Sequence, residues 1–250
     1  MQEYFVRFLR TRAQYELHPV WWLYLPLSFY ALRYAAHLFG RGGRDSFNAS
    51  FLGELGIVEN LTVLLLVLAL LVTIAVLIRF GKSLHLRVKI FLLLYCLGCI
   101  YFAGEEASWG QHWFGWESSE YFMQANDQQE TNFHNTSIWL DRVPKSIVSL
   151  LVFLGGIVAP LWFAYRGIEI NAQKPGWWLW PTWICLPSAV IATIATWPSK
   201  IENATGMKFY FDQAQETKEA FFACFILLFI LSLSIRLSRM TKQGTPFSPL

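Results

Sequence analysis

The sequence predicts an all-α integral membrane protein, a bundle of about six transmembrane helices. Hydrophobic residues make up 55% of the chain and charged residues only 15%, which is far from the balance of an ordinary soluble domain. The apolar residues also arrive in runs of about 20, the length that an α-helix needs to cross ~30 Å of hydrocarbon. Because the backbone in lipid must satisfy its own hydrogen bonds, each run is expected to be helical.

Six runs qualify as spans, and we assign them to a single transmembrane domain covering residues 1–250. They cover residues 20–39, 57–78, 88–104, 147–165, 177–197 and 219–235. The second run is the clearest, since it has no charge from residue 61 to residue 72. The first and fifth are less uniform, because Pro26, Pro181 and Pro187 remove helix donors and favour kinks. No cleavage site precedes the first run, which is therefore expected to stay in the protein.

The distribution of charge predicts the orientation of the bundle. Twelve Lys and Arg residues lie in the N-terminus, the 79–89 and 166–174 loops and the C-terminal tail, against eight on the opposite side. The positive-inside rule therefore places both termini in the cytoplasm. Fourteen of the seventeen acidic residues fall on the outer side. The basic residues are dispersed over short loops near the membrane, so nucleic-acid binding is not expected, and the partner implied is the lipid bilayer.

Carboxylates gather at the outer ends of several runs. Glu105 and Glu106 directly follow the third run and open an insertion at residues 105–145, while Glu59 opens the second run. Asp212, Glu216 and Glu219 lead into the sixth run at helical spacing, so they share one face of a helix. A charge at the bilayer centre costs roughly 2.5–3.5 kcal/mol, and less toward the interface. The recurrence of carboxylates at one depth predicts a shared polar site.

The insertion adds a second kind of ligand and many aromatic rings. Glu130 and His134 are four residues apart and would point the same way on a helix, which makes a usable half-site for a metal. Such pairs also occur on solvated helices. Eight aromatic side chains interleave with the polar groups, as expected of a segment that lies in the headgroup region. We expect this segment to form short helices, one of which is capped by Ser118 or Ser119. These aromatics are Trp109, Trp113, Phe114, Trp116, Tyr121, Phe122, Phe133 and Trp139.

Three stretches carry a resemblance to a known group of sequences. They are Gly-Ile-Val-Glu-Asn-Leu-Thr at residues 56–62, Gly-Glu-Glu-Ala-Ser-Trp-Gly-Gln at 104–111 and Glu-Thr-Asn-Phe-His-Asn at 130–135, with a weaker fourth at 216–219. The chain resembles a family of uncharacterised bacterial multi-pass inner-membrane proteins with Gly-Glu-Glu-x-Ser-Trp-Gly-Gln and Glu-Thr-Asn-x-His-Asn motifs. The resemblance implies a location in the bacterial inner membrane and implies no reaction.

These observations favour a membrane-embedded enzyme whose outward-facing carboxylate and histidine site acts on a lipid or lipid-linked envelope substrate. The candidate catalytic residues are Glu105, Glu106 and Glu219. The candidate ligands of a divalent cation are Glu130, His134 and Glu216. The candidate binding residues are Glu59, Gln111 and Asn132. In such an enzyme, Glu105 or Glu106, Glu130, His134, and Glu216 or Glu219 should line one cavity.

Two alternatives belong to other functional classes. A non-catalytic subunit or assembly factor would dock another membrane subunit through the insertion, and it should expose Trp113, Trp116 and Phe122 on a flat surface. A proton- or cation-coupled transporter should carry polar groups through the depth of the bilayer. An enzyme should instead have its carboxylates converging on a cavity that is open to lipid.

Overall fold

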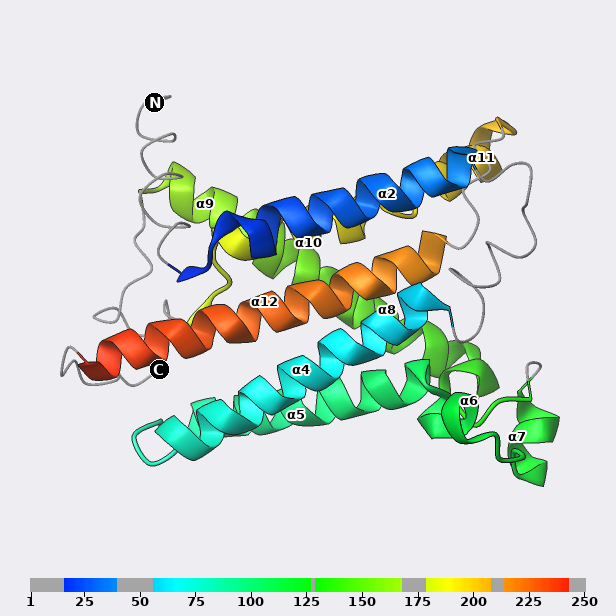
Figure 1. Ribbon diagram of the computed structural model, residues 1–250, viewed down its shortest axis with the longest axis horizontal. Helices are drawn as coiled ribbons and strands as arrows, with labels where there is room; N and C mark the ends of the chain where they lie inside the picture. The colour runs from blue at the N-terminus through cyan, green and yellow to red at the C-terminus, as the bar shows by residue number, and fades with distance from the viewer. Residues whose placement is uncertain (1–15, 40–55, 127–128, 168–178, 208–213, 243–250) are drawn as a thin grey trace.

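The computed structural model describes residues 16–39, 56–126, 129–167, 179–207 and 214–242 (Figure 1). These residues form helices and connecting turns, with no β-strand among them, so the expected all-α class is confirmed. Five helices are long and apolar enough to cross a membrane. They are Ile57–Phe80, Leu86–Glu106, Ile138–Tyr165, Trp183–Thr205 and Ala214–Lys242. The chain is therefore a multi-pass membrane protein.

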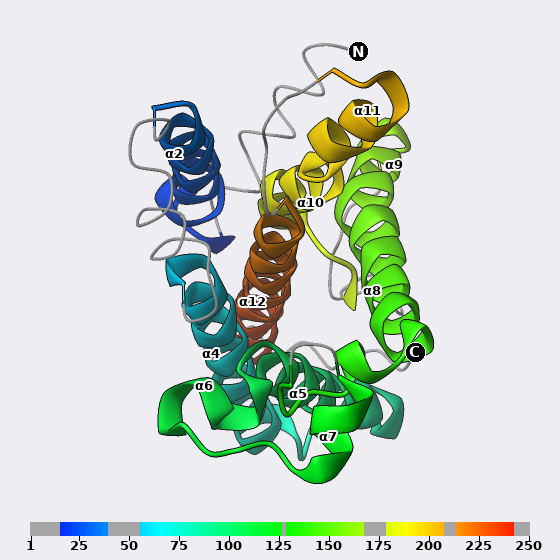
Figure 2. The same ribbon diagram turned by 90° about the vertical axis from the view of Figure 1, so that its right-hand side faces the viewer.

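Helix α12 (Ala214–Lys242) lies at the centre of the bundle (Figure 2). It packs along α4 (Ile57–Phe80), which in turn packs along α5 (Leu86–Glu106). On another side it contacts α10 (Leu186–Ile194). Apolar side chains from these helices are fully buried between them, and the Tyr95 hydroxyl of α5 donates a hydrogen bond of 2.5 Å to the Ile226 carbonyl of α12.

The fourth span begins earlier than the sequence predicted. Helix α8 (Ile138–Phe153) continues through a π-helical turn, η5 (Leu154–Val158), into α9 (Ala159–Tyr165). Its start is fixed by Ser137, whose hydroxyl accepts a hydrogen bond from the Leu140 N–H at 3.2 Å. The polar residues after residue 138 therefore belong to the spanning helix, and the expected 105–145 insertion is confined to residues between α5 and α8.

The fifth span is broken into short pieces. It consists of η7 (Trp183–Cys185), α10 and α11 (Trp197–Thr205), and both α-helical pieces begin with a proline in the first turn. The N–H groups in the first turn of a helix have no acceptor within that helix, so a proline there removes no helical hydrogen bond. The prolines can therefore separate the pieces while the hydrogen bonds inside each piece stay intact.

The first expected span is helical but less apolar than the other five. Residues 20–39 form a π-helical segment, η1 (Val20–Tyr24), followed by α2 (Leu25–Phe39). Phe29 and Tyr30 each place their rings 6.0 Å from the ring of Phe221, so α2 packs on α12. The segment contains Arg33, whose side chain is 1% exposed, and this charge lowers the apolar character of the run.

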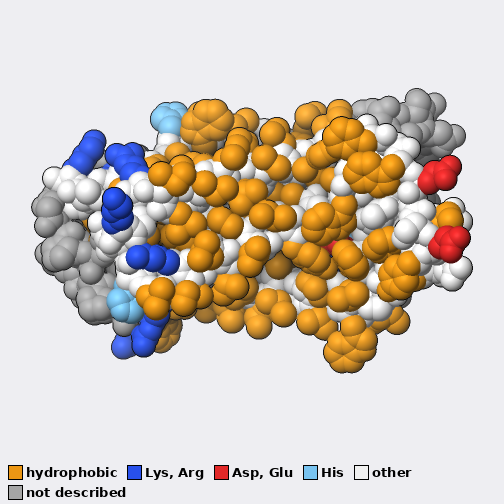
Figure 3. Space-filling view, turned by 90° about the horizontal axis from the view of Figure 1, so that it is seen from below, with side chains coloured by type: hydrophobic (Ala, Val, Ile, Leu, Met, Phe, Trp, Pro, Cys, Tyr) orange, Lys and Arg blue, Asp and Glu red, His pale blue; other side chains and the backbone are white. Residues whose placement is uncertain are grey.

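The surface agrees with a membrane-spanning bundle. Large apolar side chains form a broad belt across the middle of the face seen in Figure 3. Ile78, Leu94 and Leu151 are examples of such exposed apolar side chains, at 79%, 62% and 61% exposed. Lys and Arg side chains appear at one end of this belt in Figure 3, and Asp and Glu side chains at the other. Exposed apolar surface of this extent is stable only against lipid or another protein.

The insertion folds into short helical turns as expected. These are η3 (Ser108–Gly110), α6 (Gln111–Phe114), α7 (Glu120–Ala125) and η4 (His134–Thr136). Ser119 occupies the N-cap position of α7, although its side chain makes no capping hydrogen bond. Residues 130–133 are not helical.

Candidate functional site

Glu105 and Glu106, the last two residues of α5, have different surroundings. The Glu105 side chain is 4% exposed and surrounded by donors. Its Oε1 accepts a hydrogen bond of 2.8 Å from Trp109 Nε1, and its Oε2 accepts from the backbone N–H groups of Phe133 and His134 at 2.8 and 2.7 Å. The same oxygen lies 3.1 Å from His134 Nδ1. Glu105 therefore ties the insertion to the end of α5.

Glu130 is held in a second hydrogen-bonded group. Its Oε2 accepts from Ser108 Oγ at 2.9 Å and from Asn132 Nδ2 at 2.6 Å, while its Oε1 lies 3.2 Å from His112 Nε2. Asn126 Nδ2 in turn donates to the Glu130 carbonyl at 2.8 Å and to Asn132 Oδ1 at 2.9 Å.

The expectation that Glu130 and His134 point the same way on a helix is wrong. The side chain of Asn126 hydrogen-bonds to the Glu130 carbonyl and to the Asn132 side chain, and these bonds hold residues 129–133 in an irregular conformation, as Asn side chains do in turns. Glu130 consequently lies beside His112, and His134 lies beside Glu105.

The motifs at residues 104–111 and 130–135 form one structural unit. Ser108 of the first motif bonds Glu130 of the second, and Gln111 Oε1 accepts from the Thr131 N–H at 2.6 Å. Ser108 and Trp109 have φ of 43° and 54°, a left-handed turn that is unusual for residues with a side chain. This turn folds the Trp109 ring onto Gly104, where a Cβ would lie 3.0 Å from the ring. Packing and hydrogen bonding thus explain most residues of the two motifs, but they do not explain Glu106.

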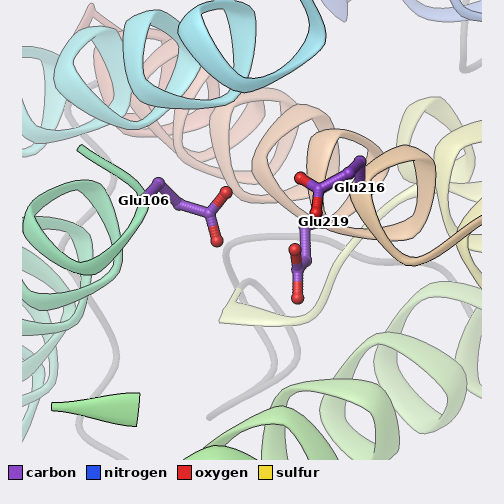
Figure 4. A group of neighbouring side chains, drawn as sticks. All are labelled: Glu106, Glu216 and Glu219. Atoms are coloured by element: carbon purple, nitrogen blue, oxygen red, sulfur yellow. The ribbon is translucent and has the colours of Figure 1, made fainter. Parts of the chain in front are cut away.

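Glu106 points instead toward two carboxylates of α12 (Figure 4). Oxygen atoms of Glu106, Glu216 and Glu219 all lie within 4.8 Å of one another, although Glu106 is more than 100 residues away in the chain. We call these three residues the carboxylate cluster. Glu106 is 9% and Glu219 4% exposed.

Among the described residues, Glu219 is the only member of the carboxylate cluster that forms a salt bridge. Glu219 Oε1 lies 3.1 Å from Lys145 Nζ of α8 and accepts a hydrogen bond of 2.7 Å from Gln215 Nε2. Lys145 is shared, since its Nζ also lies 2.8 Å from Asp141 Oδ1. Among the residues that the structure describes, Glu106 and Glu216 have neither a hydrogen bond nor an ion pair.

The electrostatics of the carboxylate cluster require protons or a cation. Two like charges 4 Å apart repel by about 4 kcal/mol at an effective dielectric constant of 20, and one ammonium cannot offset three carboxylates. The separations fit a cation, because ligand oxygens at 2.0–2.6 Å from an ion lie up to ~5 Å apart. A ligand set made only of carboxylate oxygens suits hard cations such as Mg²⁺, Mn²⁺ or Ca²⁺.

An open pocket of about 380 Å³ lies between α8 and α12 next to this cluster. Two of its lining residues, Lys145 and Gln215, are also the residues that contact Glu219. We call it the α8–α12 pocket. It is lined by Asp141, Arg142, Lys145, Ser146, Ser149, Gln215 and Lys218.

Glu106 also lines a second, separate crevice, which is too narrow for a water molecule. Glu59, His112 and Trp113 line the same crevice. Glu59 Oε1 lies 3.8 Å from His112 Nδ1, and Trp113 Nε1 donates a hydrogen bond of 3.1 Å to Asn60 Oδ1. Glu59 is therefore a neighbour of the carboxylate cluster and not a member of it.

The structure thus divides the candidate residues into two groups. Glu106, Glu216 and Glu219 come together, whereas the other six predicted residues support the folded insertion or line its edge. Those six are Glu59, Glu105, Gln111, Glu130, Asn132 and His134. Asp212 lies outside the described residues. Sequence reasoning missed Lys145 and Asp141, whose i, i+4 spacing would have indicated an ion pair had the fourth helix been started at residue 138.

The fold and the site together define a multi-pass helical membrane protein with a group of buried and half-buried carboxylates near one end of its spans. No protein-family model matches the chain, and no curated protein or solved structure matches it.

Proposed function

We propose that the protein is a membrane-embedded enzyme in which Glu106, Glu216 and Glu219 hold a divalent cation and act on a lipid or lipid-linked substrate. One observation carries the proposal: two carboxylates without partners in the described chain, Glu106 of α5 and Glu216 of α12, meet the carboxylate of Glu219 beside an open pocket. Burying such a group has a free-energy cost that folding alone does not recover, so a ligand or a reaction is the reason to keep it.

The residues around the cation would have distinct roles. The carboxylate cluster binds the ion, which can activate a water molecule or polarise an oxygen of the substrate. Lys145 and Gln215 both contact Oε1 of Glu219 and would limit the rotation of its side chain. The nearby His112 is held between Glu59 and Glu130, so its role is to support the wall of the site rather than to bind the ion.

The proposed topology has six spans with both termini in the cytoplasm and the site facing outward. The helical segment 20–39 supplies the sixth span, because 20 residues at 1.5 Å each reach ~30 Å. Arg79 and Lys82 near the α4–α5 turn and Arg239 and Lys242 at the end of α12 supply the basic cytoplasmic end. The motif resemblance supports a bacterial inner membrane as the location.

The test measures cation binding and turnover on the same preparations. Purified wild type should bind about one Mn²⁺ per chain, and should convert at least one component of a bacterial lipid extract in a reaction followed by mass spectrometry. Glu106→Gln should lose both properties, while Glu117→Gln, which changes an exposed carboxylate outside the cluster, should keep both. Equal Mn²⁺ binding by the wild type and Glu106→Gln, or turnover that survives the substitution, would refute the proposal.

A second candidate, a docking subunit, is favoured by exposed aromatics on the insertion. Trp113 and Trp116 are 51% and 42% exposed. Phe122 is half-buried, with its ring 5.3 Å from that of Phe133, so it is not part of an exposed surface. A docking subunit should lose a bound partner in Trp113→Ala with Trp116→Ala and be indifferent to Glu106→Gln. The enzyme should show the reverse pattern.

A further inference from the structure

We propose that the α8–α12 pocket binds the phosphate headgroup of a membrane lipid, whose acyl chains lie along α8. The inference rests on the proposed function and names the class of its substrate. Within the described residues, Arg142 forms no ion pair or hydrogen bond, and Lys218 lies over the Phe222 ring at 5.2 Å and forms no salt bridge. Two cations that are not held in salt bridges therefore line one pocket.

The chemistry of the lining suits a phosphate oxyanion. Arg142 offers a planar fork of donors, Lys218 offers an ammonium, and the exposed Ser146 adds a hydroxyl. Lys145 contributes little of its charge, since Asp141 and Glu219 already neutralise it. The remaining positive charge is thus carried by Arg142 and Lys218, which come from two different helices.

The size of the pocket favours a headgroup over a whole lipid. Its volume of about 380 Å³ is near the lower end of the ~300–1,000 Å³ that ligand pockets span. A diacyl lipid is much larger, so its chains must lie outside. The adjoining turns of α8 expose Ile147, Leu150 and Leu151, which are 54%, 57% and 61% exposed. This succession of a basic pocket and an apolar helix face matches the succession of a lipid headgroup and its chains.

The pocket is coupled to the carboxylate cluster through shared residues. Lys145 and Gln215 line the pocket and contact Glu219 at 3.1 and 2.7 Å. A phosphate in the pocket would lie beside three carboxylates that repel it unless a cation is bound. Occupancy by the divalent cation should therefore strengthen lipid binding, and a bound phosphate should strengthen cation binding by the same factor.

The test measures lipid binding by native mass spectrometry on the full chain, with phosphatidic acid as the probe and diacylglycerol as the comparator without phosphate. Wild type should retain phosphatidic acid at least tenfold more than diacylglycerol. The double variant Arg142→Gln with Lys218→Gln should lose this preference. The control Lys82→Gln with Lys242→Gln removes two exposed lysines from the opposite end of the spans and should keep it.

The outcomes separate this inference from the proposed function. An unchanged preference in the Arg142 and Lys218 double variant overturns the headgroup site, and so does inorganic phosphate that competes as strongly as phosphatidic acid. Mn²⁺ binding, measured on the same samples, tests the proposed cation site independently of lipid binding. A double variant that binds Mn²⁺ but has lost the phosphatidic acid preference supports both. Wild type that binds phosphatidic acid but no Mn²⁺ supports the pocket alone and contradicts the proposed cation.

Discussion

Two buried polar clusters lie toward opposite ends of the spans, and they differ in charge balance. Toward the end that carries the α4–α5 turn, Glu16 Oε2 accepts hydrogen bonds from Ser232 Oγ at 2.5 Å and Thr182 Oγ1 at 2.7 Å, and its Oε1 lies 3.8 Å from Arg236 Nε. One carboxylate thus faces one guanidinium and two hydroxyls. The carboxylate cluster at the other end has three carboxylates and a single shared ammonium.

Under the proposed function, this difference separates a structural role from a functional one. The Glu16 cluster joins three parts of the chain. Glu16 contacts Thr182, which precedes η7, and it contacts Ser232 and Arg236 of α12, so its charge is balanced by its neighbours. The carboxylate cluster has three acidic side chains and, among the described residues, one shared ammonium, and such local violations of stabilising rules are typical of functional sites. The neighbouring Glu105 and Glu106 show the same contrast. Glu105 accepts hydrogen bonds from three donors, whereas Glu106 accepts none from the residues that the structure describes.

The largest effect on stability is expected at the balanced cluster. Arg236→Gln leaves the Glu16 carboxylate without its guanidinium, and removing one partner of a buried ion pair costs about 3–5 kcal/mol. Denaturant unfolding in mixed micelles measures the free energy of unfolding. Arg239→Gln, at an exposed position one turn further along α12, should change it by less than about 0.5 kcal/mol. If the two substitutions changed the free energy of unfolding equally, the Glu16 cluster would not have a structural role.

The carboxylate cluster should respond in the opposite direction. In buffer containing a chelator, Glu106→Gln removes a repelled charge and should raise the free energy of unfolding above that of wild type. Saturating Mn²⁺ should stabilise wild type by about 2.7 kcal/mol at 100 times the dissociation constant and leave Glu106→Gln unchanged. Thermal unfolding with and without Mn²⁺ measures both effects. A destabilised Glu106→Gln variant in chelator would show that the cluster is not under electrostatic strain.

The adjacent glutamates give the next comparison. Glu105→Gln weakens an acceptor for Trp109 and for the backbone at residues 133 and 134, so a loss of about 1.5–3 kcal/mol is expected locally. Amide hydrogen exchange at residues 130–136 should accelerate. Glu106→Gln should leave this exchange at the wild-type rate, and acceleration in both variants would mean that the two residues act as one.

The smallest effects are expected at the helix caps. Ser137→Ala removes the hydroxyl that caps α8 and should cost about 1 kcal/mol. Ser119→Ala removes no capping bond at α7, so its cost should stay within a few tenths of a kcal/mol. Unfolding measurements on the two variants that gave the reverse order would contradict the capping geometry.

The sequence predicted the helical class and the positions of most spans, because long apolar runs in lipid have one stable backbone conformation. It placed the start of the fourth helix too late, since Asp141 and Lys145 resembled a polar loop but pair with each other on the helix. Spacing also predicted that Glu216 and Glu219 share a face. It failed at Glu130 and His134, where Asn side chains hold the backbone out of a helix.

The contacts that complete the candidate site could not be read from the sequence. Lys145 reaches Glu219 only because α8 crosses next to α12, and no local pattern encodes that crossing. The crossing depends on small side chains elsewhere: a Cβ at Gly156 would collide with Ala189 and Phe225. The different surroundings of Glu105 and Glu106 likewise depend on the left-handed turn at Ser108 and Trp109.

The most direct test of the cation site is an anomalous diffraction map from crystals grown with MnCl₂. The account predicts one manganese peak, about 2.0–2.6 Å from carboxylate oxygens of Glu106, Glu216 and Glu219. Crystals of Glu117→Gln should show the same peak, and crystals of Glu106→Gln should lack it. A wild-type map with no manganese among these three carboxylates, or with Glu106 turned away from the other two, would contradict the account.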